Sequence, residues 1–186
     1  MKKDYLLLSF GIFAALLLSA CQSTVPPSSS IATATPVPTD VTYTDPVTYC
    51  AAVGTIDAPD ARYTGEAVPD SVLTDYLKAA GLQNSTEPLD TLRAGTSWRC
   101  MNNQVYACNV GANLPCQSKA NTATTPTQAM NDYCTANADA AFIPASVTGH
   151  ETIYSWKCQG TTAVTDQQID KADDAGFLAS IWYALQ

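Results

Sequence analysis

The tetrapeptide SWRC at residues 97–100 returns as SWKC at residues 155–158, and this pair decides how the chain folds. Each copy is preceded by a Tyr-Cys pair, which ends at Cys50 in one case and at Cys134 in the other. A Thr-Gly pair lies between these two motifs in both places, with its glycine fifteen residues after the cysteine. The shared order of three motifs indicates a degenerate internal duplication.

The N-terminus has the pattern of a secretory signal. Lys2 and Lys3 supply positive charge, residues 6–18 are almost entirely apolar, and the stretch closes on Leu-Ser-Ala before Cys21. A short apolar segment followed by small residues is typical of a cleaved signal rather than of a spanning helix. The closing tetrapeptide resembles the lipobox of bacterial lipoproteins, which implies cleavage before Cys21 and lipid on its thiol and its new amino group. The alternatives are an ordinary secretory signal that contains a cysteine, or a retained anchor.

The residues after Cys21 predict where the protein is held. In envelope lipoproteins an aspartate at the next position signals inner-membrane retention, so the resemblance implies outer-membrane sorting for Gln22 in a cell with two membranes. The following stretch is rich in Ser, Thr and Pro and lacks apolar periodicity, which predicts a flexible tether on the extracytoplasmic side. The expected organisation is a lipoprotein signal peptide, a lipidated tether and a single domain with two half-repeats: 1–20, 21–44 and 45–186, with the half-repeats at about 47–118 and 131–186.

Six cysteines remain after Cys21: Cys50, Cys100, Cys108, Cys116, Cys134 and Cys158. An even number in an exported chain is typical of a disulfide framework. The duplication favours pairing within each half, as Cys50–Cys100 and Cys134–Cys158, which leaves Cys108 for Cys116. The alternative crosses the halves and pairs Cys50 with Cys134 or Cys158.

The Ser-Trp-basic-Cys motif is interpreted as a strand. Trp and Cys at positions i and i+2 share one face, so we expect a buried tryptophan packed on a disulfide. The basic residue between them, Arg99 or Lys157, is expected to face solvent. Asn102-Asn103 and Gln159-Gly160 follow the two copies and predict turns. Residues 104–110 then alternate well enough to form the returning strand of a hairpin.

Helical spacing occurs at two places. Residues 72–80 predict a helix with Asp70 or Ser71 as the N-cap and Gly81 as the stop. Residues 127–136 predict a second short helix, and residues 49–53 would be its duplicate. Residues 177–185 are apolar throughout and are interpreted as a buried final strand rather than a helix. The predicted class is α+β: a small, disulfide-stapled, β-rich domain with a few short helices.

The charge excludes some partners. Loss of residues 1–20 removes Lys2, Lys3 and Asp4, which changes the formal net charge from −8 to −9. Nucleic acids and anionic lipids are bound through basic patches, so neither is expected as a partner. No cofactor is expected either, since no cofactor-binding motif is present.

Metal and redox chemistry are not expected from the cysteines. The chain has no Cys-x-x-Cys motif, and its closest pair, Cys108 and Cys116, is separated by seven residues. Zinc and thioredoxin-like sites use closer pairs. His150, the only histidine, is interpreted as an exposed residue on a connecting segment, because no nucleophile motif accompanies it and Glu151 faces elsewhere on a strand.

The stretch IDAPDARYTGE at residues 56–66 carries Asp57, Asp60 and Glu66. Three acids this close could act as paired carboxylates or as a calcium site. The favoured interpretation is a loop with surface acids, and no catalytic or metal-binding residue is predicted. If the chain were an enzyme, His150 and Asp57 would be the first residues to test.

The segment CNVGANLPC, from Cys108 to Cys116, is the candidate recognition loop. A loop closed by a disulfide has already lost much of its ordering entropy, which suits recognition. Its displayed residues would be Asn109, Gly111, Asn113 and Leu114. The alternative is a tight structural corner that uses glycine and proline at required backbone angles.

Most of residues 47–186 resembles a group of uncharacterised bacterial exported proteins. The resemblance rests on CAAVGTIDAPDARYTG, on SWRCMNNQVYACNVGANLPC and on the closing aromatic segment. It implies a single domain and no activity. The expected function is a non-enzymatic binding or scaffolding module of the cell envelope with a protein or glycan partner. The alternatives are an inhibitor of secreted hydrolases such as lysozyme, and an enzyme of unrecognised class.

Overall fold

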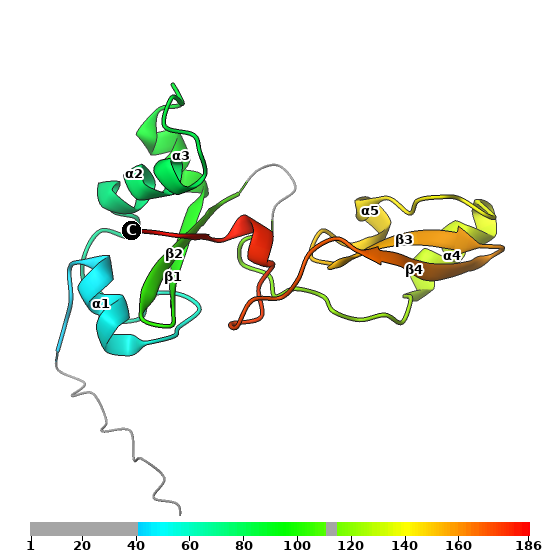
Figure 1. Ribbon diagram of the computed structural model, residues 1–186, viewed down its shortest axis with the longest axis horizontal. Coiled ribbons are helices and arrows are strands. Elements are labelled where there is room, and N and C mark those ends of the chain that lie inside the picture. The colour runs from blue at the N-terminus through cyan, green and yellow to red at the C-terminus, as the bar shows by residue number, and fades with distance from the viewer. Residues whose placement is uncertain (1–40, 111–114) are drawn as a thin grey trace, which may run out of the picture. The chain divides into compact units, whose positions relative to one another are not determined.

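The computed structural model describes residues 41–110 and 115–186 (Figure 1). The predicted α+β class is confirmed, because short helices and small antiparallel sheets occur in roughly equal shares and three disulfides join them. No helix in the described ranges is long and apolar enough to cross a membrane. The predicted lipidation site and three of the four residues that the candidate recognition loop would display lie outside the described residues: Cys21, Gly111, Asn113 and Leu114.

The first half-repeat contains three helices followed by a hairpin: α1 (Pro46–Val53), α2 (Asp70–Ala79), α3 (Leu89–Gly95), β1 (Thr96–Met101) and β2 (Gln104–Asn109). β2 lies between β1 and the short strand β5 (Tyr183–Ala184), and both pairings are antiparallel. Asn102 and Asn103 make the predicted turn with φ of 54° and 65°. Two positive φ angles match the twist of a tight hairpin, and asparagine tolerates them.

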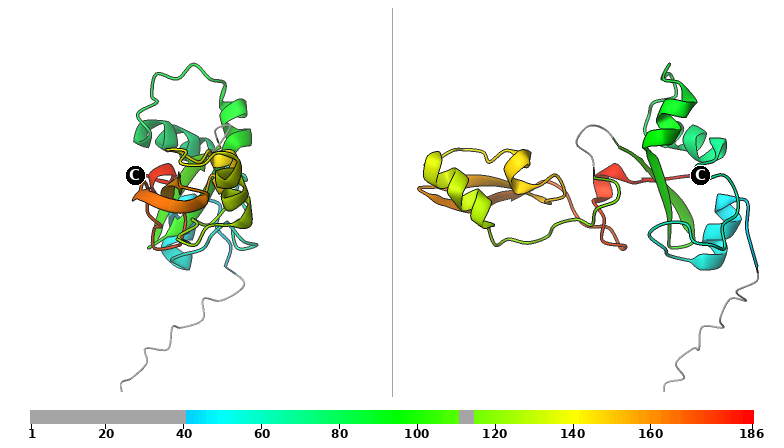
Figure 2. Two further views of the ribbon diagram at one scale, coloured as in Figure 1. Left: turned by 90° about the vertical axis from the view of Figure 1, so that its right-hand side faces the viewer. Right: turned by 180° about the vertical axis from the view of Figure 1, so that it is seen from behind.

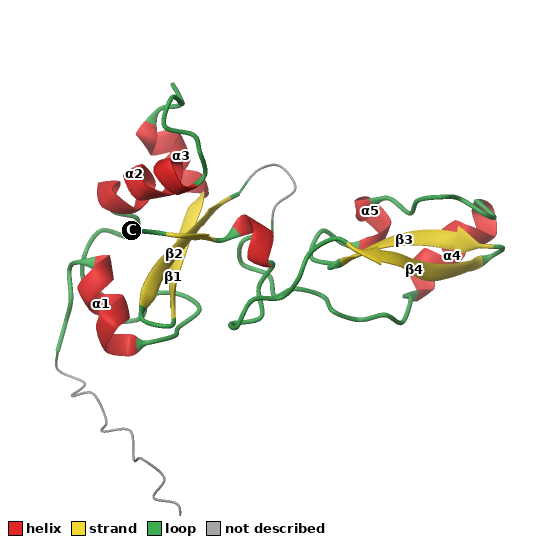
Figure 3. Ribbon diagram, in the orientation of Figure 1, coloured by secondary structure: helices red, strands yellow, loops and turns green. Residues whose placement is uncertain are grey.

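The second half-repeat uses a similar plan: α4 (Gln128–Ala136), α5 (Ala145–Thr148), β3 (Tyr154–Gln159) and β4 (Thr162–Gln168). β3 and β4 form a separate two-stranded antiparallel sheet, drawn in yellow in Figure 3. The Thr127 side chain caps α4 by accepting a hydrogen bond from the backbone N–H of Met130 at 3.3 Å. The predicted helix at residues 127–136 is therefore confirmed, with its first helical residue at 128.

Each of the two predicted half-repeats attaches its helix to its hairpin in a similar way. The three disulfides follow the within-half scheme: Cys50–Cys100, Cys108–Cys116 and Cys134–Cys158. Six residues after each helix cysteine, the chain returns to the strand that carries the partner cysteine. Ile56 exchanges two backbone hydrogen bonds with Cys100, and Ala140 accepts one from the N–H of Cys158 at 2.8 Å. Each half thus repeats a helix, a cross-link, a returning segment and a hairpin.

Helices α1 and α2 cover one face of the three-stranded sheet (Figure 2). Trp98 lies opposite Ala107 and Cys100 opposite Val105, so all four side chains share that face. The core formed there comprises Tyr49, Cys50, Val72, Tyr76, Trp98, Cys100, Val105, Ala107 and Leu185. Trp156 packs with Cys158 in the corresponding core of the second half. The predicted packing of tryptophan on a disulfide is confirmed in both halves.

Arg99 does not face solvent, and that prediction is wrong. Its side chain points away from Trp98, as strand alternation requires, but it is 0% exposed. The cause is a second covering layer on the opposite face of the sheet, where Cys108, Cys116, Phe177 and Trp182 form a further core cluster. Lys157, the equivalent residue of the second half, keeps 45% of its side chain exposed.

The apolar segment at residues 177–185 is a strand only at its end. It contains a one-turn 3-10 helix (Ala179–Ile181) and the two-residue strand β5. Phe177 and Trp182 are buried against the sheet face that carries Arg99. An irregular segment can cover a sheet face with two large aromatic side chains, so the apolar run reflects burial without a long strand.

Helix α2 begins two residues before the expected start at residue 72. Its N-cap is Pro69, and no side chain donates or accepts a capping hydrogen bond there. The predicted N-caps, Asp70 and Ser71, are instead the first two helical residues. Val72, Leu73 and Tyr76 are its buried residues, as their spacing predicts.

Candidate functional site

The acids of residues 56–66 do not converge on one site. The carboxylate of Asp57 lies 2.6 Å from the ammonium nitrogen of Lys119. Glu66 lies 3.8 Å from the guanidinium of Arg93, and Asp60 lies 2.6 Å from the guanidinium of Arg62. The three acids therefore pair with three different basic residues. This is typical of acidic side chains on a surface loop and not of two carboxylates that face one another in a catalytic or metal site.

Asp60 is a structural residue. Hydrogen bonds from Arg62, one of them 2.6 Å long, lower the pKa of Asp60 to about 2. Its carboxylate also accepts a hydrogen bond from the hydroxyl of Tyr49 at 3.1 Å, and the same hydroxyl accepts one from the Asp60 backbone N–H at 3.0 Å. Burial raises the pKa of Tyr49, so that hydroxyl stays protonated. The network fixes the loop to α1.

His150 is exposed between α5 and β3. Across residues 41–110 and 115–186, no group of three or more His, Cys, Asp or Glu side chains could hold a metal ion. Asn109, the one residue among the four predicted to be displayed by the recognition loop that the structure describes, donates from its amide nitrogen to the carbonyl of Leu92 and to the hydroxyl of Thr96, at 2.9 and 2.8 Å. Its amide nitrogen thus anchors β2 to the end of α3.

The sequence gives no sign of the cluster that surrounds Arg99. The guanidinium forms an ion pair with Asp173, whose side chain is 9% exposed. Three aromatic rings lie around the guanidinium carbon, with centroids at 5.5, 4.5 and 4.4 Å: Tyr106, Phe177 and Trp182. Such cation–π contacts favour a desolvated guanidinium. The Arg99 cluster thereby holds residues 173–182 against the sheet.

A cleft opens between α1 and α2, on the sheet face that carries the main core. It measures about 290 Å³ and is lined by Asp45, Pro46, Val47, Ser71, Val72, Asp75, Asn103, Gln104, Val105, Leu185 and Gln186. We call it the α1–α2 cleft. The floor is apolar because Val72, Val105 and Leu185 belong to the core. The C-terminal end of the chain lies between the two helices in Figures 1 and 2.

The rim of the α1–α2 cleft is acidic. Asp45 caps α1, where one carboxylate oxygen accepts a hydrogen bond from the N–H of Thr48 at 2.9 Å. Asp75 lies one helical turn after Ser71, so both side chains are on the same side of α2. Neither aspartate forms an ion pair within the part of the chain that the structure describes. Two carboxylates next to an apolar floor make a site that favours an apolar group with a positive end.

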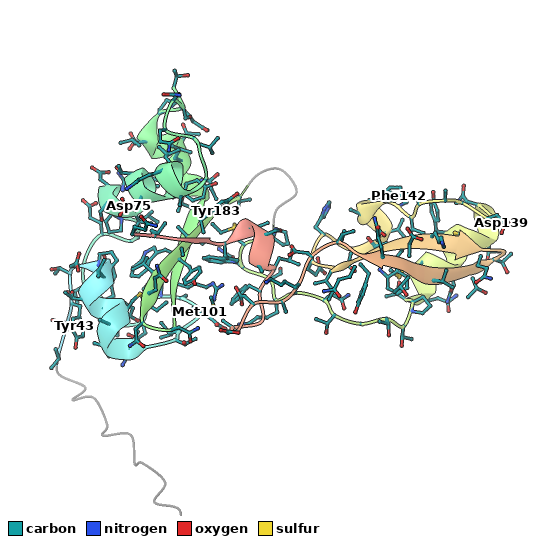
Figure 4. All side chains as sticks on the ribbon, viewed as in Figure 1. Tyr43, Asp75, Met101, Asp139, Phe142 and Tyr183 are labelled. Atoms are coloured by element: carbon teal, nitrogen blue, oxygen red, sulfur yellow. A yellow bond between two sulfur atoms is a disulfide. The ribbon has the colours of Figure 1, made fainter. Side chains whose placement is uncertain are left out.

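An adjoining hollow continues the cleft beside the end of the chain. It is lined by Asp75, Lys78, Ala79, Ala184 and Gln186, so it shares Asp75 and Gln186 with the cleft. Figure 4 labels Asp75 on α2 and Tyr183 on β5, the facing elements that form its two sides. The T-shaped contact of Tyr76 with Tyr183, with centroids 5.6 Å apart, holds α2 and β5 at this separation.

No known family matches this chain, and neither a curated protein nor a solved structure is significantly similar to it. The cleft and its rim are therefore interpreted from their own geometry. A cleft of this size is at the lower end of the range for small-ligand sites, about 300–1,000 Å³, so it suits a group as large as one side chain.

Proposed function

We propose that this protein is a non-enzymatic binding module of the bacterial cell envelope, held to a membrane by lipid on Cys21. In this proposal the α1–α2 cleft receives part of an envelope partner. The observation that carries it is an apolar floor of core residues beneath an acidic, amide-rich rim. Apolar surface supplies affinity and a few placed polar groups supply orientation, which is how binding sites are generally built.

Rigidity supports the same proposal. The Cys50–Cys100 disulfide joins α1 to β1, and the core packs both helices on the sheet that forms the floor. A site whose walls are already fixed loses little entropy when it binds. The tether predicted for residues 21–44 would let such a domain reach a partner away from the membrane surface.

Membrane attachment is tested by metabolic labelling. Radioactive palmitate should label the wild-type chain and not the Cys21→Ala variant, because the acyl chains need that thiol and the amino group that cleavage exposes. Several acyl chains give stable anchoring, whereas one gives marginal binding, so the variant should also leave the membrane fraction. Equal labelling of both chains would exclude Cys21 as the lipidated residue.

Binding through the cleft is tested by photo-crosslinking in intact cells. A photoreactive amino acid at Val47, which lines the cleft and is 63% exposed, should give a discrete adduct. The same probe at Ile169, which is 59% exposed and does not line the cleft, is the matched control. Ser71→Trp should abolish the Val47 adduct by filling the cleft, whereas Thr74→Trp, exposed on the same helix outside the lining, should preserve it.

The outcomes separate the candidate functions. Adducts of equal yield from Val47 and Ile169, or an adduct that survives Ser71→Trp, would contradict binding through the cleft. An adduct with a muralytic hydrolase, together with inhibition of that hydrolase by the purified protein, would make the module an inhibitor.

A further inference from the structure

We infer that the α1–α2 cleft takes a lysine side chain from an extended segment of a partner polypeptide. This segment pairs with the edge of β5 that no other strand of the described residues occupies. The inference rests on the proposed function, since it names the chemistry of the partner at the same site. Three features carry it: the charge of the rim, the shape of the floor and the open edge of the sheet.

The acidic rim of the cleft favours a ligand group with a positive charge. The charged side chains that line the cleft are Asp45 and Asp75, and both are carboxylates. An ammonium group placed between them gains two opposite charges without displacing an ion pair seen in the described residues. Lys78 lies in the adjoining hollow, three residues along α2 from Asp75, and its positive charge would weaken the attraction of a bound ammonium group to this end of the cleft.

The apolar floor of the cleft favours a side chain with an aliphatic stem. Val72, Val105 and Leu185 are each less than a tenth exposed and present aliphatic surface at the bottom of the cleft. Lysine carries four methylene groups between its backbone and its ammonium group, so the stem can lie on aliphatic surface while the charge stays at the wet rim. A shorter or fully polar side chain would leave this floor uncovered.

The edge of the sheet favours a polypeptide as the partner, because it can offer backbone hydrogen bonds. The Leu185 N–H donates to the carbonyl of Val105 at 2.9 Å, and Ala184 lies opposite Tyr106. Hydrogen-bonded and non-hydrogen-bonded pairs alternate along antiparallel strands, so the N–H and carbonyl of Ala184 point away from β2. β5 is the last strand of its sheet, and Ala184 lines the hollow that continues the cleft. Extended peptides bind such edges and place alternate side chains in adjacent pockets.

The test uses the full acylated chain in nanodiscs of zwitterionic lipid and three peptides, acetyl-Ala-Xaa-Ala-amide with lysine, norleucine or glutamate at the centre. Competition against a fluorescent copy of the lysine peptide, read by anisotropy, gives the three affinities. We expect lysine to bind about threefold to tenfold more tightly than norleucine, because two partly exposed carboxylates attract its ammonium group, and glutamate to bind most weakly. High salt should remove the preference for lysine.

Matched variants assign the preference to the rim. Asp45→Asn with Asp75→Asn should make lysine and norleucine equal, and asparagine still caps α1, so folding is preserved. Glu87→Gln removes the same type of charge from an exposed position outside the cleft and should change nothing. Lys78→Gln should strengthen binding of the lysine peptide, since it removes a positive charge from the hollow that adjoins Asp75.

The results distinguish this inference from the function on which it rests. Equal binding of lysine and norleucine, lost in Ser71→Trp, would keep the cleft as the site and overturn its preference for a cation. If all three peptides bind weakly while the Val47 adduct still forms in cells and is lost in Ser71→Trp, the cleft remains the binding site. Only the inference of a lysine-bearing segment would then be wrong. Butylammonium that competes as well as the lysine peptide would overturn the role of the β5 edge. If the variant with Asp45→Asn and Asp75→Asn still preferred the lysine peptide to the norleucine peptide, groups other than these two carboxylates would attract the ammonium group.

Discussion

Replacing Asp173 by asparagine is expected to lower the free energy of unfolding by about 3–5 kcal/mol, because it leaves a buried guanidinium without its carboxylate. Arg99 is 0% exposed, so water cannot take the place of Asp173. The carboxylate also accepts hydrogen bonds from the backbone N–H groups of Ala175 and Phe177, both at 3.0 Å. Asparagine keeps the shape of this turn while it removes the charge.

The measurement is denaturant unfolding of wild type and variant under non-reducing conditions, with the exposed ion pair of Lys157, the equivalent of Arg99 in the second half, as control. Lys157 lies 2.7 Å from Asp166, and both side chains are more than a third exposed. Asp166→Asn should therefore cost about 0–1 kcal/mol, as exposed ion pairs do. Arg99 and Lys157 are equivalent residues of the two hairpins, but Asp166 lies on β4 beside Lys157, whereas Asp173 lies beyond β4 in the segment that covers Arg99. The control therefore shows the cost of removing an aspartate from an exposed ion pair of the same type. Similar losses for the two variants would show that Arg99 is hydrated in solution.

A double replacement tests what the buried pair supplies. Arg99→Met combined with Asp173→Leu should recover much of the stability lost in Asp173→Asn, because a buried ion pair can be replaced by packed apolar groups at small cost. The Arg99 Nε–H has no hydrogen-bond partner within the described residues, which adds to the cost of keeping the charge there. A double variant as unstable as Asp173→Asn would instead assign the stability to the three aromatic contacts of the guanidinium.

The repeated motifs predict much of the fold because they encode local relations. Two-residue alternation places Trp98 and Cys100 on one face, and the turn residues Asn102 and Asn103 fix the register of the hairpin. The matching order of the motifs then selects the within-half disulfides. These features depend on residues that are close in sequence or placed equivalently in both halves, so one sequence contains enough information to predict them.

Burial of Arg99 and the α1–α2 cleft could not be predicted in this way. Alternation states that Arg99 points away from Trp98, but whether that face meets solvent depends on Asp173, 74 residues further along the chain. The cleft combines the start of α1, the first turns of α2, the β1–β2 turn and the chain end. No local pattern in any of these segments marks them as neighbours, since only the closed sheet brings them together.

The cleft lies in the first of the two predicted half-repeats. Helix α2 belongs to the insertion that separates the Thr-Gly pair from Ser97, and the second half has only HETIY at that place. The shared unit of helix, disulfide and hairpin builds a stable core in both halves. The insertion adds α2 beside α1 and leaves a space between them, so one wall of the candidate site, formed by Ser71, Val72 and Asp75, comes from sequence that the repeat does not share.

Removing the Cys50–Cys100 disulfide by a double replacement with alanine is expected to cost about 4 kcal/mol, the largest loss among the three disulfides. This bond closes a loop across a sequence separation of 50 residues, compared with 24 for Cys134–Cys158 and 8 for Cys108–Cys116. A longer loop loses more unfolded-state entropy when it is closed, so the expected losses for the other two pairs are about 3.5 and 2.5 kcal/mol.

The order of the three double variants is the decisive observation, since all six cysteines of the three disulfides are buried and removal leaves a comparable space. Urea unfolding should show the order and a higher m-value for the variant without Cys50–Cys100, because its unfolded chain is less compact. That variant should also weaken binding in the α1–α2 cleft, because the bond joins α1 to the sheet that forms the floor. If Cys108→Ala with Cys116→Ala were the most damaging change, packing around the Arg99 cluster, and not loop length, would set the order.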